Sequence, residues 1–215
     1  MTLRLIHRST ALVLLLFIVV HLSVHLFALA GPGAHEAALR SVQWVYRHPV
    51  GEALLVLAIV VQLITGASRL RVRGQRGWGL VQAVSGVYLL VFLVLHPSAA
   101  LYTHHIFGIE TDFWWSAGSL YYDEIRVGFA VYYTLAIVAL FAHAAAAIQY
   151  TWPTLRPVAR YVPIGGFAVA VSIVLAMGGA FYPIDLPSEV AAYYEHIFDI
   201  DTSRVARGEP VANHR

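Results

Sequence analysis

The chain has 215 residues, of which 59% are apolar, and its formal net charge is only +2. A mean hydropathy of +0.69 is rare among soluble domains of this length, so the composition argues against an ordinary soluble globular protein. The absence of cysteine excludes disulfides, iron–sulfur clusters and thiolate-ligated haem within this chain. The arginines are distributed over several separate loops, which does not suggest a nucleic-acid partner.

Long segments without Asp, Glu, Lys or Arg follow one another along the chain. Each contains about 18 or more mainly apolar residues, enough for a helix to cross a hydrocarbon layer of about 30 Å. They are too long and too continuously apolar for the strands of a membrane barrel. We therefore predict an all-α polytopic membrane protein, a five-helix bundle forming a single membrane domain over residues 1–215. The predicted helices span residues 8–30, 50–70, 78–102, 125–150 and 160–182.

The distribution of charge predicts the orientation. Arginines gather at one end of the predicted bundle, as expected for the inside face. All twelve carboxylates fall at or beyond the other end. We expect the N-terminus inside, the C-terminus outside with residues 183–215 as an outside tail, and a bacterial-type inner (cytoplasmic) membrane as the location. The inside arginines are Arg4, Arg8, Arg69, Arg71, Arg73, Arg76, Arg156 and Arg160.

Residues 1–30 also resemble a secretory signal peptide. Two arginines precede an apolar run that ends in Ala28-Leu29-Ala30, and cleavage after Ala30 is the alternative to a retained helix. The run is long for a signal peptide and contains two histidines. Both features favour a retained transmembrane helix.

Histidines inside the predicted helices are the strongest functional signal. His21 and His25 lie in the first helix, His96 in the third and His143 in the fourth. Ionisable side chains in a bilayer are costly and mark functional sites, and imidazole is the usual ligand of b-type haem iron. The pattern therefore predicts a membrane cytochrome.

Depth along the helices suggests which histidines share an iron. His21 lies about 16 Å from the inner side when counted from Thr10, and His143 lies about 12 Å from it when counted from Thr151. This similarity favours His21 and His143 as the axial ligands of one haem b. His25 and His96 are expected nearer the outside, as second-shell groups or as an alternative ligand pair. The competing interpretation is that these histidines only form hydrogen bonds in the core.

Other polar groups are interpreted more conservatively. Gln62 is expected to form an interhelical hydrogen bond. A second group of histidines is expected at interfaces or in water. It comprises His7, His35, His48, His104, His105, His196 and His214.

An internal repeat relates residues 105–112 to residues 196–203. It predicts either two similar interfacial turns or, less favoured, a metal or partner site. The side chains of that site would be His105, Glu110, His196 and Asp201.

Several motifs resemble the five-helix cytochrome b subunit of succinate dehydrogenase and fumarate reductase. That family has a haem-ligating histidine in its first helix, a Gln-Ala-x-Thr-Gly motif before the third-helix histidine, and a ligand histidine before small residues in the fourth. Arg8-Ser9 is similar to a segment near the quinone in related membrane anchors. The matching segments here are Thr10-Ala11-Leu12 with His21, Gln82-Ala83-Val84-Ser85-Gly86 with His96, and Phe141-Ala142-His143 with Gln149-Tyr150.

The chain also departs from this family. Dihaem members have a second ligand pair on the second and fifth helices, where this chain has Gln62 and no histidine, respectively. The fifth helix also lacks the family's acidic residue. The resemblance thus implies one remaining haem, held by His21 and His143, and puts electron transfer across the full membrane in question.

The resulting functional hypothesis is a b-type cytochrome subunit that exchanges electrons with a quinone and is not catalytic alone. Glu52, Arg8 and Ser9 are the candidate quinone-site residues. Expected partners are membrane lipid, flavoprotein and iron–sulfur subunits on the inside face, or further copies of the chain. Alternatives are a haem-free scaffold of the same fold, and a metal-handling protein that uses His104, His105 and His196 with outside carboxylates.

Overall fold

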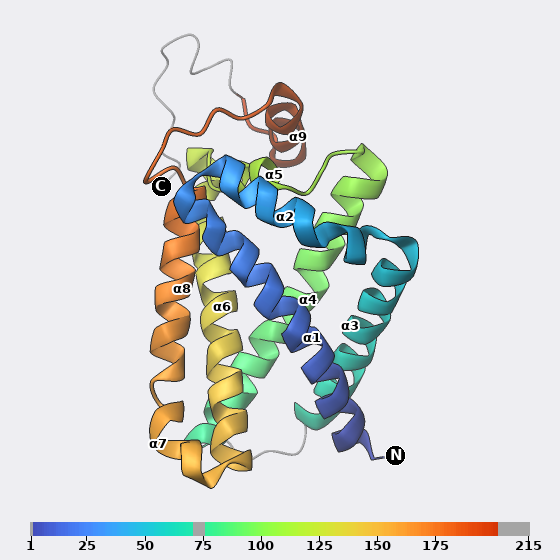
Figure 1. Ribbon diagram of the computed structural model, residues 1–215, viewed down its shortest axis with the longest axis vertical. Coiled ribbons are helices and arrows are strands. Elements are labelled where there is room, and N and C mark those ends of the chain that lie inside the picture. Colours follow the sequence, from blue (N-terminus) through green and yellow to red (C-terminus); the bar gives the residue numbers. More distant parts are fainter. Residues whose placement is uncertain (1, 71–75, 202–215) are drawn as a thin grey trace.

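The structure, a computed structural model, describes residues 2–70 and 76–201, and all regular secondary structure in these residues is helical. The all-α prediction is confirmed. Arg71, Arg73 and His214 lie outside the described residues. Long helices run between the two ends of the molecule (Figure 1): α1 (Leu3–Leu26), α3 (Pro49–Leu70), α4 (Trp78–Phe107), α6 (Asp123–Thr151) and α8 (Val162–Met177). The shorter elements are η1 (Phe27–Ala30), α2 (Pro32–Arg47), α5 (Phe113–Gly118), η2 (Pro153–Leu155), α7 (Arg156–Ala159) and α9 (Ser188–Phe198).

Among the described residues, four helical segments are long and apolar enough to cross a membrane. They are α1 with η1, α3, α4 and α6. A fifth span results if Pro153–Ala159 and Val162–Met177, which are bent by 45° at their junction, are taken together. Large apolar side chains point away from the bundle, as in Leu16 (70% exposed) and Ile64 (61% exposed). These are the features of a multi-pass membrane protein whose outer surface suits lipid.

Some helix boundaries differ from the predicted ones for identifiable reasons. α1 begins at Leu3 and therefore includes Arg4 and Arg8, whose long apolar stems let a helix carry charge at its end. α4 continues through Pro97 to Phe107 instead of ending at residue 102. α8 ends at Met177, and Gly179 follows in a left-handed conformation with φ +79°.

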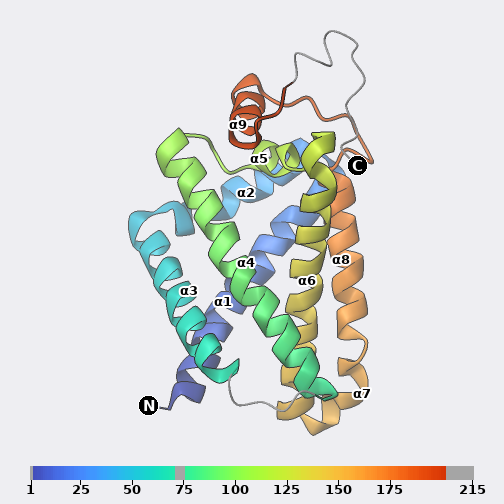
Figure 2. The same cartoon turned by 180° about the vertical axis from the view of Figure 1, so that it is seen from behind.

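The long helices form two groups. α6 packs extensively against α8 and against α4, while α1 packs mainly against α3. Small buried residues let α6 and α8 approach closely, among them Ala139 and Ala146 on α6 and Gly166 and Ala170 on α8. α1 crosses α4 obliquely in both views (Figures 1 and 2). The α1–α3 group and the α4–α6–α8 group are therefore less closely packed against each other than the helices within each group.

Three short helices, α2, α5 and α9, cover the end of the bundle opposite the N-terminus (Figures 1 and 2). We call this the capped end. Asp112 caps α5 by accepting hydrogen bonds from the backbone N–H groups of Trp114 (2.9 Å) and Trp115 (3.1 Å). α9 docks through the Tyr194 hydroxyl, which donates to the Trp115 carbonyl at 2.6 Å. Part of the predicted tail is thus an ordered helix.

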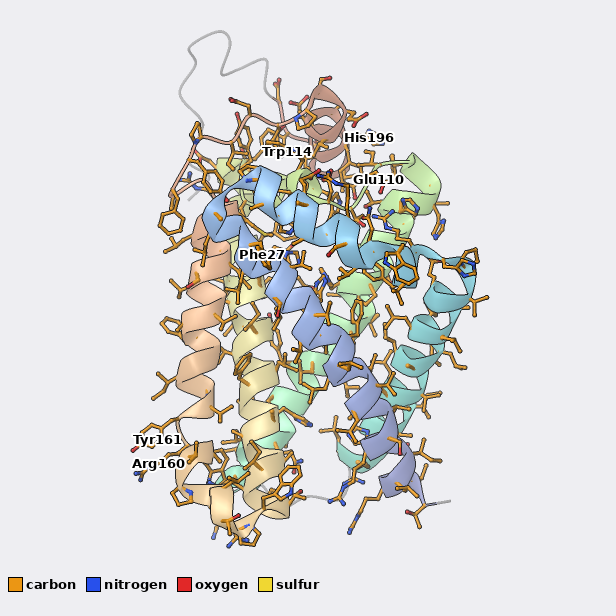
Figure 3. The ribbon with its side chains drawn as sticks, in the orientation of Figure 1. Phe27, Glu110, Trp114, Arg160, Tyr161 and His196 are labelled. Atoms are coloured by element: carbon orange, nitrogen blue, oxygen red, sulfur yellow. The ribbon has the colours of Figure 1, made fainter. Side chains whose placement is uncertain are left out.

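The two ends of the molecule differ in charge. Glu110, Trp114 and His196 lie at the capped end, whereas Arg160 and Tyr161 lie at the opposite end (Figure 3). The Arg160 guanidinium stands over the Tyr161 ring at 4.7 Å from its centroid. The inside position of the N-terminus stays a prediction from the charge distribution.

Candidate functional site

A cavity of about 900 Å³ lies between the two helix groups. It is lined mainly by aliphatic and aromatic side chains and falls within the range of about 300–1,000 Å³ typical of small-molecule sites. The lining runs from His7 and Arg8, near the N-terminal end, to His35 and His104 at the capped end. The four histidines predicted within the membrane all contribute to it: His21, His25, His96 and His143.

His21 of α1 and His96 of α4 lie next to each other on the wall of this cavity, with their ring planes inclined by 62°. Their ring centroids are 6.1 Å apart. Each ring is held by a phenylalanine one helical turn earlier: Phe17 stacks on His21 at 5.5 Å, and Phe92 stacks on His96 at 4.9 Å. The two imidazoles therefore come from different helices and have fixed orientations.

His25 lies next to His21 and connects it to the capped end. Its Nε2 is 3.1 Å from Nε2 of His21, and its Nδ1 is 3.1 Å from Nε2 of His35 on α2. His25 thus uses both ring nitrogens in contacts with other imidazoles. This arrangement places His25 between His21 and His35.

His143 of α6 lies at a different level. Its Nδ1 is 3.2 Å from Oγ of Ser85 on α4, and its ring is beside Gly86. Gly86 precedes His96 by ten residues, or about 15 Å along the helix. The structure therefore brings His21 together with His96 and places His143 nearer the N-terminal end.

Polar side chains of α1 and α3 form a cluster in the N-terminal half of the cavity, where His143 also lies. The sequence analysis did not predict this cluster. The Thr10 hydroxyl of α1 donates to Oε1 of Gln62 on α3 at 2.6 Å, which confirms the predicted interhelical bond of Gln62. His7 lies 3.1 Å from the Thr65 hydroxyl and 3.4 Å from Nε2 of Gln62. His7 is therefore half-buried within the bundle, not simply solvated as expected. His7 lies three residues before Thr10 and therefore on the same helix face, which was the sequence feature that could have predicted its burial.

The three candidate quinone residues do not share one location. Arg8 lines the cavity at its N-terminal end, and Ser9 is exposed and is not part of the lining. Glu52 lines the cavity at the capped end, where its Oε1 is 2.9 Å from Nε2 of His105. The structure therefore separates Glu52 from Arg8 by most of the cavity length.

The histidines at the capped end have individual partners. The Arg47 guanidinium donates to Nδ1 of His104 at 2.8 Å and pairs with Glu110 at 2.8 Å, while His105 pairs with Glu52. Within residues 2–70 and 76–201, no three His, Cys, Asp or Glu side chains form a group suited to a metal ion. The contacts do not assemble the metal site that one alternative hypothesis requires.

The internal repeat corresponds to two helix ends. α4 ends at Phe107, followed by Gly108 at φ +68°, and α9 ends at Phe198, followed by Asp199 at φ +52°. Both helices thus end with phenylalanine before a left-handed residue, the usual helix-terminating geometry. These are two similar turns, the interpretation favoured from the sequence.

His35 is the clearest error of the sequence analysis. The sequence analysis places it at an interface or in water, yet it is only 1% exposed, on the inner face of α2 with Leu39 one turn later and Phe113 at 5.4 Å. Burial, and to a lesser extent His21, lowers the pKa of His35 from 6.5 to about 4. The position of His35 one turn before Leu39, on the same face of an amphipathic helix, was the signal that could have revealed this burial.

This burial predicts an acid-sensitive attachment of α2. Because the folded-state pKa is lowered, His35 supports the fold above pH 6.5, and this support is lost as the pH falls from 6.5 toward 4. The shift corresponds to at most about 3 kcal/mol. Thermal unfolding in detergent should show a steep loss of stability over this range in the wild type and a shallower one in His35→Gln. Equal slopes would contradict the prediction, and His48→Gln, at an exposed position, is the matched control.

Comparison with protein-family models, curated proteins and solved structures finds no match to this chain. The site must therefore be interpreted from its own geometry. Two neighbouring imidazoles from different helices within an apolar cavity are the kind of donor set that could hold a haem.

Proposed function

We propose that the chain is a b-type cytochrome subunit of a membrane electron-transfer complex. One haem b would lie between α1 and α4, with His21 and His96 as axial ligands. The observation that carries this proposal is the 6.1 Å separation of these two ring centroids inside the cavity.

The separation supports ligation on simple geometric grounds. An imidazole nitrogen binds a metal at about 2 Å, so two rings on opposite sides of one metal have centroids about 6 Å apart. The stacked Phe17 and Phe92 side chains would hold the imidazoles in place, which limits the reorganisation needed for ligation. The pairing differs from the His21–His143 pair implied by the family resemblance, because His143 lies at the level of Gly86.

A bound haem would supply one-electron redox chemistry, and the protein would set its environment through neutral imidazoles and an apolar cavity. The reaction partner we propose is a quinone, for which the cavity offers polar groups at both ends: His7 and Gln62 at one, and Glu52 at the other. Partner subunits would exchange the electrons with the soluble phase, since this cysteine-free chain cannot hold an iron–sulfur cluster through thiolates.

The direct test is a reduced-minus-oxidised absorption spectrum of the full chain, purified from a haem-producing host. We expect a b-type α-band with about one haem per chain by pyridine haemochrome assay. A well-folded protein without this band would reject the proposal and leave the haem-free scaffold.

A further inference from the structure

A chain of hydrogen-bonded imidazoles extends from the cavity toward the capped end. His21 and His25 are joined at 3.1 Å, and His25 and His35 are joined at 3.1 Å. The chain passes from α1 to α2, and its three members all line the cavity.

Such a chain has a definite chemical property. A neutral imidazole carries one N–H donor and one acceptor nitrogen, so His25 can donate through one nitrogen only while it accepts through the other. If a proton arrives at one end, each ring takes up a proton on one nitrogen and releases the proton on its other nitrogen. One proton leaves the far end for each that enters, and every ring remains neutral afterwards.

The capped-end terminus of the chain has an unused nitrogen. Nδ1 of His35 is buried and has no hydrogen-bond partner among the described residues. Buried polar nitrogens are normally hydrogen-bonded, so this nitrogen is the open end of the imidazole chain. His35 is a suitable end group, since burial lowers its pKa and keeps the ring neutral near pH 7.

A carboxyl group lies next to the His35 end of the imidazole chain. Glu36 is the next residue of α2, and burial together with the nearby Asp112 raises the pKa of its carboxyl group. Its Oε1 is buried and meets no hydrogen-bond partner within the described part of the chain, while its Oε2 accepts from Arg40 at 3.2 Å. Glu36 thus lies between the buried histidine chain and the exposed Arg40 at the surface of α2.

We propose that His25 and His35 form a proton relay between the cavity and the capped end. The relay concerns protons and goes beyond the proposed electron transfer, although it rests on that proposal for the reaction that it serves. Ligation through Nε2 of His21 would remove one partner of His25, whose Nε2 would then face the cavity directly.

The proposed reaction requires such a route. Oxidation of a quinol to a quinone releases two protons and two electrons, which the single proposed haem would pass one after the other to the partner subunits. An apolar cavity gives the protons no path of their own. The relay would take a proton at Nε2 of His25, pass the Nδ1 proton of His25 to Nε2 of His35 and release the Nδ1 proton of His35. Both rings would then return to their first tautomers before the second proton follows.

The relay can be tested without any cofactor. Full-length chain labelled with ¹⁵N-histidine, in lipid bilayers, is transferred to D₂O, and exchange of the His25 ring N–H is followed by solid-state NMR. In His35→Gln, the amide can still bond to His25 but does not pass a proton, so we expect exchange to slow at least tenfold. His48→Gln, at an exposed position beyond α2, should leave the rate unchanged.

A second variant guards against a folding defect in His35→Gln. His25→Gln interrupts the same chain from α1 and should slow exchange at the His21 ring to a similar degree. Unchanged exchange in both variants would overturn the relay. If the two variants slow exchange but the wild type has no haem band, the relay is supported and the cytochrome proposal is rejected. If the wild type has a haem band but the variants leave exchange unchanged, the cytochrome proposal is supported and the relay is rejected.

Discussion

Replacing His96 with alanine should abolish the b-type α-band of the purified protein, and His21→Ala should do the same. Each substitution removes one of the two imidazoles whose ring centroids lie 6.1 Å apart. Loss of even second-shell groups lowers metal affinity about 10–100-fold, so loss of an axial ligand should reduce haem content at least about tenfold. Pyridine haemochrome assay of detergent-purified variants, at matched protein concentration, provides the measurement.

His143→Ala distinguishes the two possible pairings. His143 lies beside Ser85 and Gly86, about 15 Å along α4 from His96, so this variant should retain the band. A band that is lost in His143→Ala and retained in His96→Ala would restore the pairing implied by the family resemblance and contradict the geometry argued above.

Gly166→Ala should strongly destabilise the bundle. A β-carbon at Gly166 on α8 would stand 2.5 Å from Cβ of Phe141 on α6, and a Cβ atom cannot move without its backbone. Overpacking of this kind costs about 1–3 kcal/mol. We expect a lower midpoint of thermal unfolding in detergent, followed by circular dichroism at the helix band.

Gly165→Ala is the matched control for this prediction. It lies on the same helix, one residue earlier, and a β-carbon there would have no heavy atom within 4 Å. The control should be neutral or slightly stabilising, since alanine is favoured over glycine in a helix by roughly 0.5–1 kcal/mol. Equal midpoints for both variants would show that the α6–α8 contact is not as close as described.

Hydropathy was sufficient to predict the helices but not which histidines meet. Counting from Thr10, within a helix predicted to begin at residue 8, placed His21 about 16 Å from the inner side. In the structure α1 begins at Leu3, eighteen residues before His21, which corresponds to about 27 Å. The charges of Arg4 and Arg8 suggested a late start, although arginine is tolerated in the first turns of a membrane helix.

Helix tilt also contributes to the difference between the predicted pair, His21 with His143, and the observed neighbours, His21 and His96. Depth counted in residues compares two histidines only if their helices run parallel, and α1 crosses α4 obliquely (Figures 1 and 2). No local pattern reports that crossing, because it depends on the packing of α1 against α3 and of α6 against α4 and α8. His35 was missed for a similar reason: its burial depends on α2 folding back over the end of the bundle.

Axial ligation of the haem iron is the most direct test of the central claim. Electron paramagnetic resonance of the oxidised protein should show a low-spin haem with two imidazole ligands. Methionine ligation changes both the spectrum and the reduction potential, so His96→Met should give a histidine–methionine signal and a higher potential, whereas His143→Met should leave both unchanged. A changed signal in His143→Met with an unchanged one in His96→Met would contradict the assignment of His21 and His96.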